Sequence, residues 1–135
     1  MSYSFVEVSP TQVASNCEAL RFLEKAAEGF GGIFSVAKTL QNAISGKDLF
    51  VFVKNETKLR GAIHLTVTEQ DVGRVLTSVL LGGEHFREWA QELREFYYKL
   101  AKQHACDEFY YMGRAGFKEY FPELKEVARI YRVIL

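Results

Sequence analysis

A strand that turns through two glycines into a long helix is the feature that most constrains the fold of this chain. Residues 75–81 form the strand-like run Val-Leu-Thr-Ser-Val-Leu-Leu, Gly82 and Gly83 follow, and helical periodicity begins at Glu84. A junction of this kind places free backbone N–H groups and the positive end of a helix dipole beside a buried strand, where an anionic ligand can bind. We therefore expect the functional site at this junction.

Length and composition indicate one ordinary globular domain over residues 1–135, large enough for a single hydrophobic core. The 17 basic side chains balance the 17 acidic ones, so the charge favours neither nucleic acid nor an anionic membrane as a partner. The chain has no apolar run of roughly 20 residues and no signal-like start, which predicts a location in the cytoplasm of the producing cell. Cys17 and Cys106 are expected to be small buried hydrophobes without a disulfide.

Periodicity and turn signals predict a single mixed sheet with helices. A capping hydroxyl at Ser9 and a second capping-box spacing from Ser15 to Glu18 precede helical patterns, and polar turns separate three consecutive β-rich runs that we expect to form an antiparallel meander. The right-handed crossover rule makes the strands on either side of the long helix parallel neighbours. In chain order, the predicted elements are strand 4–8, helices 16–28 and 33–44, strands 49–54, 59–68 and 72–81, helix 84–104, strand 106–112, helix 113–121 and strand 127–135.

This order of elements, together with two glycine motifs, resembles the general-control-type N-acetyltransferase (GNAT) fold. The motifs are the glycine turn at Gly82 and Gly83 and the run Gly113-Arg114-x-Gly116-Phe117 after the fifth strand. Their combination with Trp89 is similar to short GNAT-like proteins encoded by tailed bacteriophages. The resemblance implies an α/β (α+β) fold, a single mixed-sheet domain of GNAT (acyl-CoA N-acyltransferase) topology, with acetyl-CoA as the cofactor if the protein is active.

The resemblance also implies where the cofactor binds. In an active member, the fourth strand splays from the fifth, the pantetheine arm pairs with the exposed strand, and the pyrophosphate sits on the turn into the long helix. Tyr120 lies near the family's general acid, although the closest register places Phe121 there. Carried onto this sequence, the cofactor-binding residues are Val79, Leu80, Leu81, Gly82, Gly83, His85 and Arg87.

Three departures from the family pattern bear on activity. The usual Arg/Gln-x-x-Gly-x-Gly/Ala signature is reduced to an adjacent glycine pair, so fewer N–H groups converge. Glu84 places a carboxylate in the first turn, where it would repel pyrophosphate unless it points away. The fourth strand contains no acid that could serve as a base. These departures favour a protein whose acetyl-transfer chemistry is degenerate or absent.

The remaining polar and aromatic residues indicate a partner surface rather than a metal centre. The three histidines, His64, His85 and His104, lack the spacing of metal ligands, so no metal site is expected. Aromatic residues crowd the fifth strand and the segment after it, and the closing strand ends without a polar tail. Core packing is the default explanation, but the number of aromatics favours self-association or contact with other phage or virion proteins through this C-terminal region.

Three hypotheses follow from the sequence. The first is a phage-type GNAT-fold protein that acts as a binding, assembly or virion component. The second is an active acetyl-CoA-dependent N-acetyltransferase that modifies a protein or a small amine, with Tyr120 as its acid. The third is an unrelated mixed α/β binding module, which would show the fourth and fifth strands fully paired.

Overall fold

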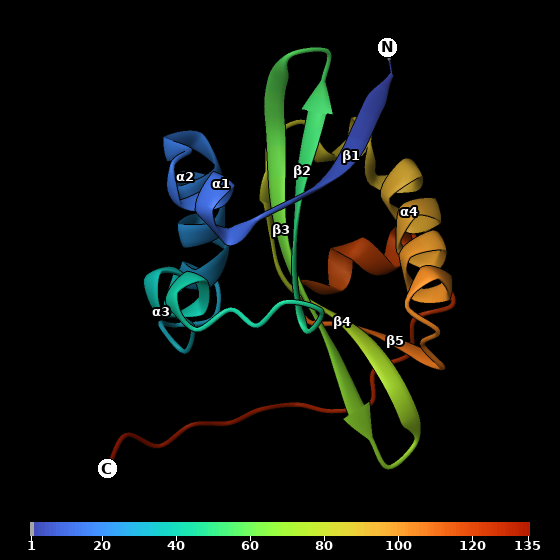
Figure 1. Ribbon diagram of the computed structural model, residues 1–135. Helices are drawn as coiled ribbons and strands as arrows, with labels where there is room; N and C mark the ends of the chain where they lie inside the picture. The colour runs from blue at the N-terminus through green and yellow to red at the C-terminus, as the bar shows by residue number, and fades with distance from the viewer. Residues whose placement is uncertain (1) are drawn as a thin grey trace.

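The computed structural model describes residues 2–135 and is built around one five-stranded sheet (Figure 1). The sheet order is β1-β2-β3-β4-β5, with antiparallel pairs from β1 to β4 and a parallel pair between β4 and β5. The meander of β2, β3 and β4 and the parallel pair are as predicted. With η denoting a 3-10 helix, the elements are β1 (Tyr3–Val8), α1 (Pro10–Ala14), α2 (Cys17–Glu28), α3 (Val36–Gln41), β2 (Asp48–Asn55), β3 (Lys58–Gln70), β4 (Gly73–Gly83), η1 (Phe86–Glu88), α4 (Ala90–Gln103), β5 (Glu108–Tyr111) and η2 (Ala115–Glu119).

Each face of the sheet has its own hydrophobic core. Helices α1, α2 and α3 cover one face, and α4 with the segment around η2 covers the other (Figure 1). Because side chains alternate between the two faces of a strand, both cores draw on the same central strands. The α2 face is built around Phe22, Leu23, Phe50, Phe52, Val79 and Leu80. The α4 face is built around Leu65, Leu76, Trp89, Leu93, Tyr97, Phe117 and Phe121.

Helix α1 begins at the predicted capping residue Ser9, whereas α2 is capped by Asn16, one residue after the Ser15 of the predicted capping box. The Ser9 hydroxyl accepts a hydrogen bond from the N–H of Gln12 at 3.1 Å, and the Gln12 side chain accepts one from the N–H of Ser9 at 2.8 Å. The Asn16 side chain accepts from the N–H of Ala19 at 3.0 Å and so starts α2. These bonds satisfy backbone donors that have no partner inside a helix. They fix where α2 starts on its face of the sheet.

An extra residue in β4 separates the carboxyl half of this strand from β5. Leu65 of β3 pairs with Ser78, but the residue before it, His64, pairs with Leu80. Val79 therefore has no partner in β3 and forms a bulge. The parallel pairing with β5 ends at Ser78 and Tyr111, and the N–H of Met112 makes the last bond, to Ser78 O at 3.0 Å. Strand β4 then continues to Gly83 without β5 beside it. The predicted splay is therefore present, and the fully paired arrangement of the third hypothesis is not.

The predicted strand over residues 127–135 is wrong. This segment has no regular structure, and within the described residues no backbone hydrogen bond is formed by residues 125–135. The side chains of the segment are strongly β-forming, but a strand also needs a neighbour to bond with, and this segment pairs with no strand of residues 2–135. The predicted C-terminal strand is therefore an exposed extended segment (Figure 1).

Several boundaries also differ from prediction. The helix predicted from Glu84 begins as η1 and becomes α-helical only at Ala90, and the helix predicted over 113–121 is the 3-10 turn η2. The helix predicted over 33–44 is shorter, α3, because the glycine-rich segment before it delays its start to the capping Ser35.

The two cysteines are free thiols; Cys106 is partly buried, but the prediction that Cys17 is buried is wrong. Cys17 is exposed because it occupies the first position of α2, outside the apolar face of that helix. Among the described residues, no helix is both long and apolar enough to span a bilayer.

Candidate functional site

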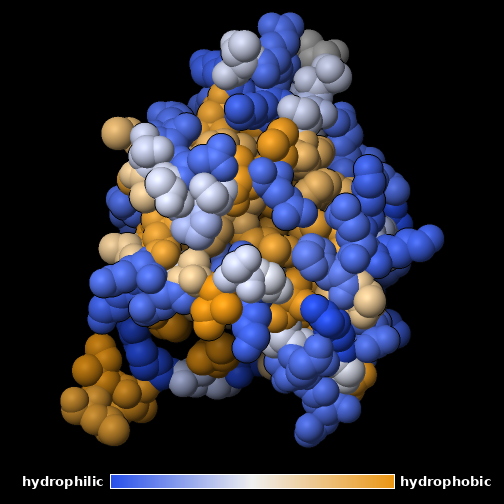
Figure 2. Space-filling view, in the orientation of Figure 1, coloured by the Kyte–Doolittle hydropathy of each residue, from blue (hydrophilic) through white to orange (hydrophobic). Residues whose placement is uncertain are grey.

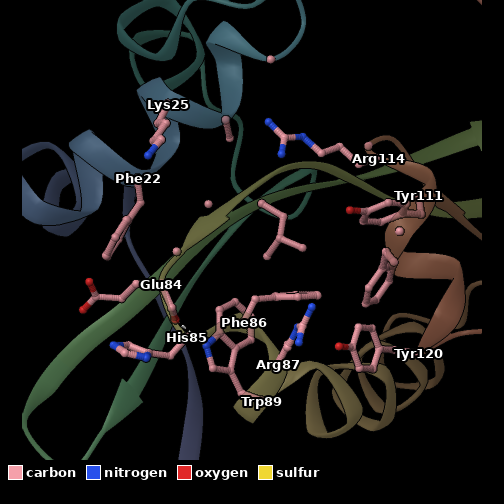
Figure 3. A pocket seen from close by; sticks show the side chains of 18 of the residues that line it. Phe22, Lys25, Glu84, His85, Phe86, Arg87, Trp89, Tyr111, Arg114 and Tyr120 are labelled. Atoms are coloured by element: carbon pink, nitrogen blue, oxygen red, sulfur yellow. Dashed lines mark hydrogen bonds between the residues drawn. The ribbon is translucent and has the colours of Figure 1, made fainter.

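A cavity of about 1020 Å³ opens where β4 and β5 diverge (Figure 3). Its walls come from three parts of the chain: helix α2, the end of β4 with the turn into α4, and the segment from the end of β5 through η2. Polar and aromatic side chains on these walls include Arg21, Phe22, Lys25, Phe30, Glu84, His85, Phe86, Arg87, Glu88, Tyr111, Arg114, Glu119 and Tyr120. The cavity therefore lies at the junction that the sequence singles out.

The structure brings most of the predicted site residues together around this cavity. Its lining includes Leu81, Gly82, Gly83, His85, Arg87 and Tyr120. The side chains of Val79 and Leu80 do not reach it: they are 8 % and 1 % exposed and pack in the core under α2. The bulge is the reason, because the extra residue turns Leu80 onto the same face as Val79.

The two hinge glycines are required by close packing inside the protein. A Cβ on Gly82 would lie 2.6 Å from the carbonyl carbon of Phe22 in α2, and closer still to its oxygen. A Cβ on Gly83 would lie 2.6 Å from the carbonyl oxygen of Arg60 and 2.9 Å from the Cα of Gly61. Glycine at these positions lets α2 and β3 approach the hinge, which closes the floor of the cavity.

The backbone after the hinge is held in place by specific bonds. The N–H of Glu84 donates to Arg60 O at 2.8 Å, and the indole N–H of the fully buried Trp89 donates to Glu84 O at 2.9 Å. His85 adopts a left-handed conformation with φ of 55° and makes no side-chain capping bond to η1. The first N–H groups of a helix have no partner inside it. The residues that carry these donors, Phe86 and Arg87, line the cavity.

The charge of Glu84 at the hinge is compensated within the protein. Its carboxylate accepts a hydrogen bond from the Arg60 guanidinium at 2.9 Å, with the two side chains 35 % and 19 % exposed. Three further cations line the cavity without an ion pair in the described part of the chain: Lys25, Arg87 and Arg114. Lys25 and Arg114 extend toward the upper rim from opposite walls (Figure 3). The cavity can therefore accept an anionic group despite Glu84.

Two tyrosine hydroxyl groups point into the cavity (Figure 3). Burial raises the pKa of Tyr111 to about 12, with nearby Arg114 opposing this shift, so its phenol is protonated at neutral pH. Tyr120 packs edge-on against Phe86, with ring centroids 5.8 Å apart. Its neighbour Phe121 is buried at 3 % exposure on the α4 face. The structure thus turns Tyr120, rather than Phe121, toward the site.

Sequence reasoning missed the contribution of α2. Arg21, Phe22 and Lys25 belong to an amphipathic helix whose pattern shows only that one face is buried. In the sequence, Tyr111 is one of several aromatic residues of the fifth strand and Arg114 is part of the glycine motif, and neither pattern indicates a role in the site. Only the bulge and the approach of α2 to Gly82 bring these residues to one cavity, and neither leaves a local signal.

The histidines and acids of the described residues are dispersed over the structure. The described residues contain no group of three or more His, Cys, Asp or Glu side chains placed to hold a metal ion. His64 lies outside the cavity lining, and its Nε2 is 2.9 Å from a carboxylate oxygen of Asp48. Burial lowers the pKa of His64, and the bond to Asp48 opposes this shift. His64 is therefore a structural residue of the core.

Comparison with solved structures places this fold among acetyltransferases. An aminoglycoside acetyltransferase from an uncultured soil metagenomic sample superposes with a TM-score of 0.69 and 14 % identity, covering 100 % of both chains. A second soil-metagenome aminoglycoside acetyltransferase, solved with sisomicin, superposes with a TM-score of 0.69 and 11 % identity, covering 98 % of this chain and 97 % of the other. Ribosomal-protein-alanine N-acetyltransferase from Brucella melitensis biovar Abortus 2308 superposes with a TM-score of 0.69 and 13 % identity, covering 100 % of this chain and 99 % of the other.

The chain has the GNAT fold. Identities of this size show the fold alone, and by sequence no family model and no curated protein matches the chain. The GNAT topology inferred from the sequence is confirmed over the whole chain. The bacteriophage origin is not supported by these comparisons and stays a prediction.

Proposed function

We propose that the protein is an acetyl-CoA-dependent N-acetyltransferase that acts on an amine. The observation that carries this proposal is the divergence of β4 from β5 at Val79, which opens a cavity walled by a glycine hinge, unpaired cations and two tyrosine hydroxyls. The solved structures with this fold are named as acetyltransferases, which supports the same reaction class.

The residues around the hinge fit an anionic, elongated cofactor. Strand β4 beyond Ser78 has no β5 neighbour, so its backbone can pair with an extended amide-containing arm. Arg87 and Arg114 can hold phosphate groups, because each is an unpaired cation on the cavity wall. Acetyl-CoA, when bound, supplies the acetyl group as a reactive thioester. The ion pair between Arg60 and Glu84 removes the repulsion expected from the sequence.

The same cavity contains groups that can manage the protons of the transfer. As the C–N bond to the acceptor forms and the C–S bond breaks, the departing sulfur needs a proton and the acceptor nitrogen must lose one. Tyr120 and Tyr111 are the donors that point into the cavity. Glu119 lines the wall and can attract a cationic amine and accept its proton, whereas Glu84 and Glu88 already accept hydrogen bonds from Arg60 and Tyr3. Glu119 thus offers a carboxylate that β4 lacks.

Two measurements test the proposal together. A saturating ligand at a hundredfold its dissociation constant stabilises the folded state by about 2.7 kcal/mol, so acetyl-CoA should raise the melting temperature by several degrees. Release of free thiol should then be followed with a panel of amines that includes an aminoglycoside and a peptide with an N-terminal alanine. The proposal would be rejected if acetyl-CoA did not stabilise the protein and no amine in the panel gave release of thiol.

Matched variants assign the effect to the cavity. Tyr120→Phe should reduce kcat, whereas Tyr110→Phe, a change outside the cavity lining, should not. Arg87→Gln should weaken binding of acetyl-CoA about fivefold, because an exposed charge contact contributes up to about 1 kcal/mol. Arg129→Gln, a change of an exposed arginine in the C-terminal segment, is its control. Equal effects in both members of a pair would argue against this site.

A second candidate is a binding or assembly protein that has this fold but performs no transfer, as the departures in sequence favour. One structural observation supports it: backbone atoms of α2 and β3 occupy the space beside the hinge glycines, which leaves less room there for a ligand. A role in a phage particle belongs to this candidate and has no support from the solved structures. Stabilisation by CoA without thiol release would favour it over the enzyme.

A further inference from the structure

The α2 wall of the cavity carries positive charge and no carboxylate. Its lining residues are Arg21, Phe22, Lys25, Ala26, Gly29 and Phe30. The charge of Arg21 is compensated by an ion pair with Glu18, which lies outside the lining. Within residues 2–135, the side chains of Lys25 and Arg114 form no ion pair, and they extend from opposite walls (Figure 3). Two such cations without a counter-ion attract an anion.

The acids of the cavity do not neutralise this pair of cations. Three carboxylates line the cavity, those of Glu84, Glu88 and Glu119. Glu84 and Glu88 are held by bonds to β3 and β1, and Glu119 belongs to η2. Within the described part of the chain, none of the three forms an ion pair with Lys25 or Arg114. The charge of the pair is therefore available to a ligand.

The two ends of the unpaired stretch of β4 differ in what borders them. Gly83 ends the stretch at the hinge, where Arg87 can hold the phosphates of the cofactor. At the bulge end, Ser78 still pairs with Tyr111, and Arg114 follows shortly after Tyr111. A cofactor arm that runs along β4 from phosphates at the hinge carries its thioester toward the bulge end. Arg114 and Tyr111 therefore border the place where the acceptor amine must arrive.

A solute can reach the two cations from outside. The side chains of Lys25 and Arg114 are exposed. Among the described residues, none after Tyr120 lines the cavity, so the C-terminal segment, residues 125–135, does not cover it. Figure 2 shows the apolar end of this segment projecting from the body of the molecule at the lower left. The α2 side of the cavity is thus an entrance for a small acceptor.

We propose that the acceptor is an amine that also carries a carboxylate, and that Lys25 and Arg114 bind this carboxylate. The inference rests on the proposed function and specifies its substrate class. A guanidinium binds a carboxylate through two parallel hydrogen bonds, and an ammonium group adds a point charge. In the transfer, the amine nitrogen bonds to the acetyl carbon and loses a proton, while the C–S bond breaks and the sulfur gains one. The carboxylate is unchanged, so the products are an N-acetylated amino acid and free CoA thiol.

The same charges disfavour a polycationic acceptor. An aminoglycoside carries several ammonium groups, and α2 presents Lys25 where such a group would need a carboxylate. We therefore expect this chain to differ in its acceptor from the solved aminoglycoside acetyltransferases whose fold it shares.

Matched acceptors test the charge requirement. Each ω-amino acid, from glycine upward in steps of one methylene, is compared with its primary amide and with the diamine of the same length, and release of thiol is measured. At the preferred length, kcat/KM should fall at least about fivefold from the acid to the amide, and further for the diamine. Equal values for acid and amide at every length, or transfer to the diamines alone, would overturn this inference and leave the acetyltransferase intact. No transfer to any amine and no stabilisation by acetyl-CoA would reject both.

Variants assign the preference to the two cations. Lys25→Met and Arg114→Gln should each raise KM for the preferred amino acid about fivefold and leave the Kd of acetyl-CoA unchanged. Lys99→Met, an exposed lysine of α4 outside the lining, and Arg129→Gln are the controls. Lys25→Glu should raise kcat/KM for the diamine while lowering it for the acid, a reversal that misfolding cannot produce. If Arg114→Gln weakens acetyl-CoA binding as Arg87→Gln does and leaves KM for the amino acid unchanged, Arg114 serves the phosphates and the inference is overturned.

Discussion

Substitution of Gly82 by alanine tests how the hinge closes the cavity. The added Cβ would lie 2.6 Å from the carbonyl carbon of Phe22, and backbone of α2 cannot rotate away as a flexible side chain can. Gly82 lies within β4 and has no left-handed φ, so the contact alone decides the outcome. Overpacking of this kind costs about 1–3 kcal/mol, and the entropy advantage of alanine over glycine returns about 0.5 kcal/mol. Because the Cβ would come still closer to the Phe22 carbonyl oxygen, the cost lies toward the upper end of this range, and we expect a net loss of about 2 kcal/mol.

Gly116→Ala is the matched control. Gly116 lines the same cavity, but a Cβ there meets nothing within 4 Å. Urea unfolding of both variants gives their free energies of unfolding, and for a chain of this size a loss of about 2 kcal/mol lowers the melting temperature by roughly 6 °C. A Gly82→Ala protein that is within about 0.5 kcal/mol of the parent, the scatter of ordinary surface substitutions, would refute the inferred contact between α2 and the hinge.

Three further outcomes follow from the same structure. Tyr97→Phe should destabilise the protein by about 1–3 kcal/mol, because the buried Ser78 hydroxyl, 2.7 Å from that of Tyr97, loses its partner; adding Ser78→Ala should recover part of the loss in urea unfolding. Burial lowers the pKa of folded His64, so stability should fall as the pH drops below about 6.5 and level off below the folded-state pKa; His64→Gln should flatten this pH dependence of unfolding. His85→Val should cost about 1–2 kcal/mol in thermal unfolding, because φ is 55° there, whereas His85→Gly should be tolerated.

Features that depend on neighbouring residues in the chain were predictable from sequence. The cap at Ser9 was predictable, and that of α2 lies only one residue from the predicted Ser15, since a capping side chain bonds to backbone only three residues away. The parallel pairing of β4 with β5 followed from the length of the helix between them. The glycine hinge was likewise visible, because an adjacent pair of glycines interrupts a continuous apolar run.

Features that depend on distant parts of the chain were not predictable. Val79 and Leu80 are equally suited to any strand, and only the register of β3 makes Val79 the extra residue. The reason for the glycines was missed as well: they accommodate the backbone of α2 and β3, in addition to bordering the cavity. The Arg60 partner of Glu84 lies 24 residues away, so no local pattern could show that this carboxylate is paired.

The C-terminal segment shows the limit of local preference. Residues 127–135 have the composition of a strand but remain irregular, because hydrogen bonding between strands is a property of pairs. By contrast, most of the aromatic residues around β5, which suggested a partner surface, pack against one another and α4. The exposed apolar surface lies a few residues further along the chain than the composition alone indicates.

The bulge at Val79 is what separates the end of β4 from β5. Ser78 faces α4 while Val79 and Leu80 both face α2, so deleting Val79 would restore regular alternation and leave Leu80 and Leu81 on their present faces, opposite His64 and Ile63. The chain would lose the Val79 side chain from the layer under α2, and β4 could continue its ladder with an extended β5. A chain one residue shorter would thus trade an open groove for a closed sheet.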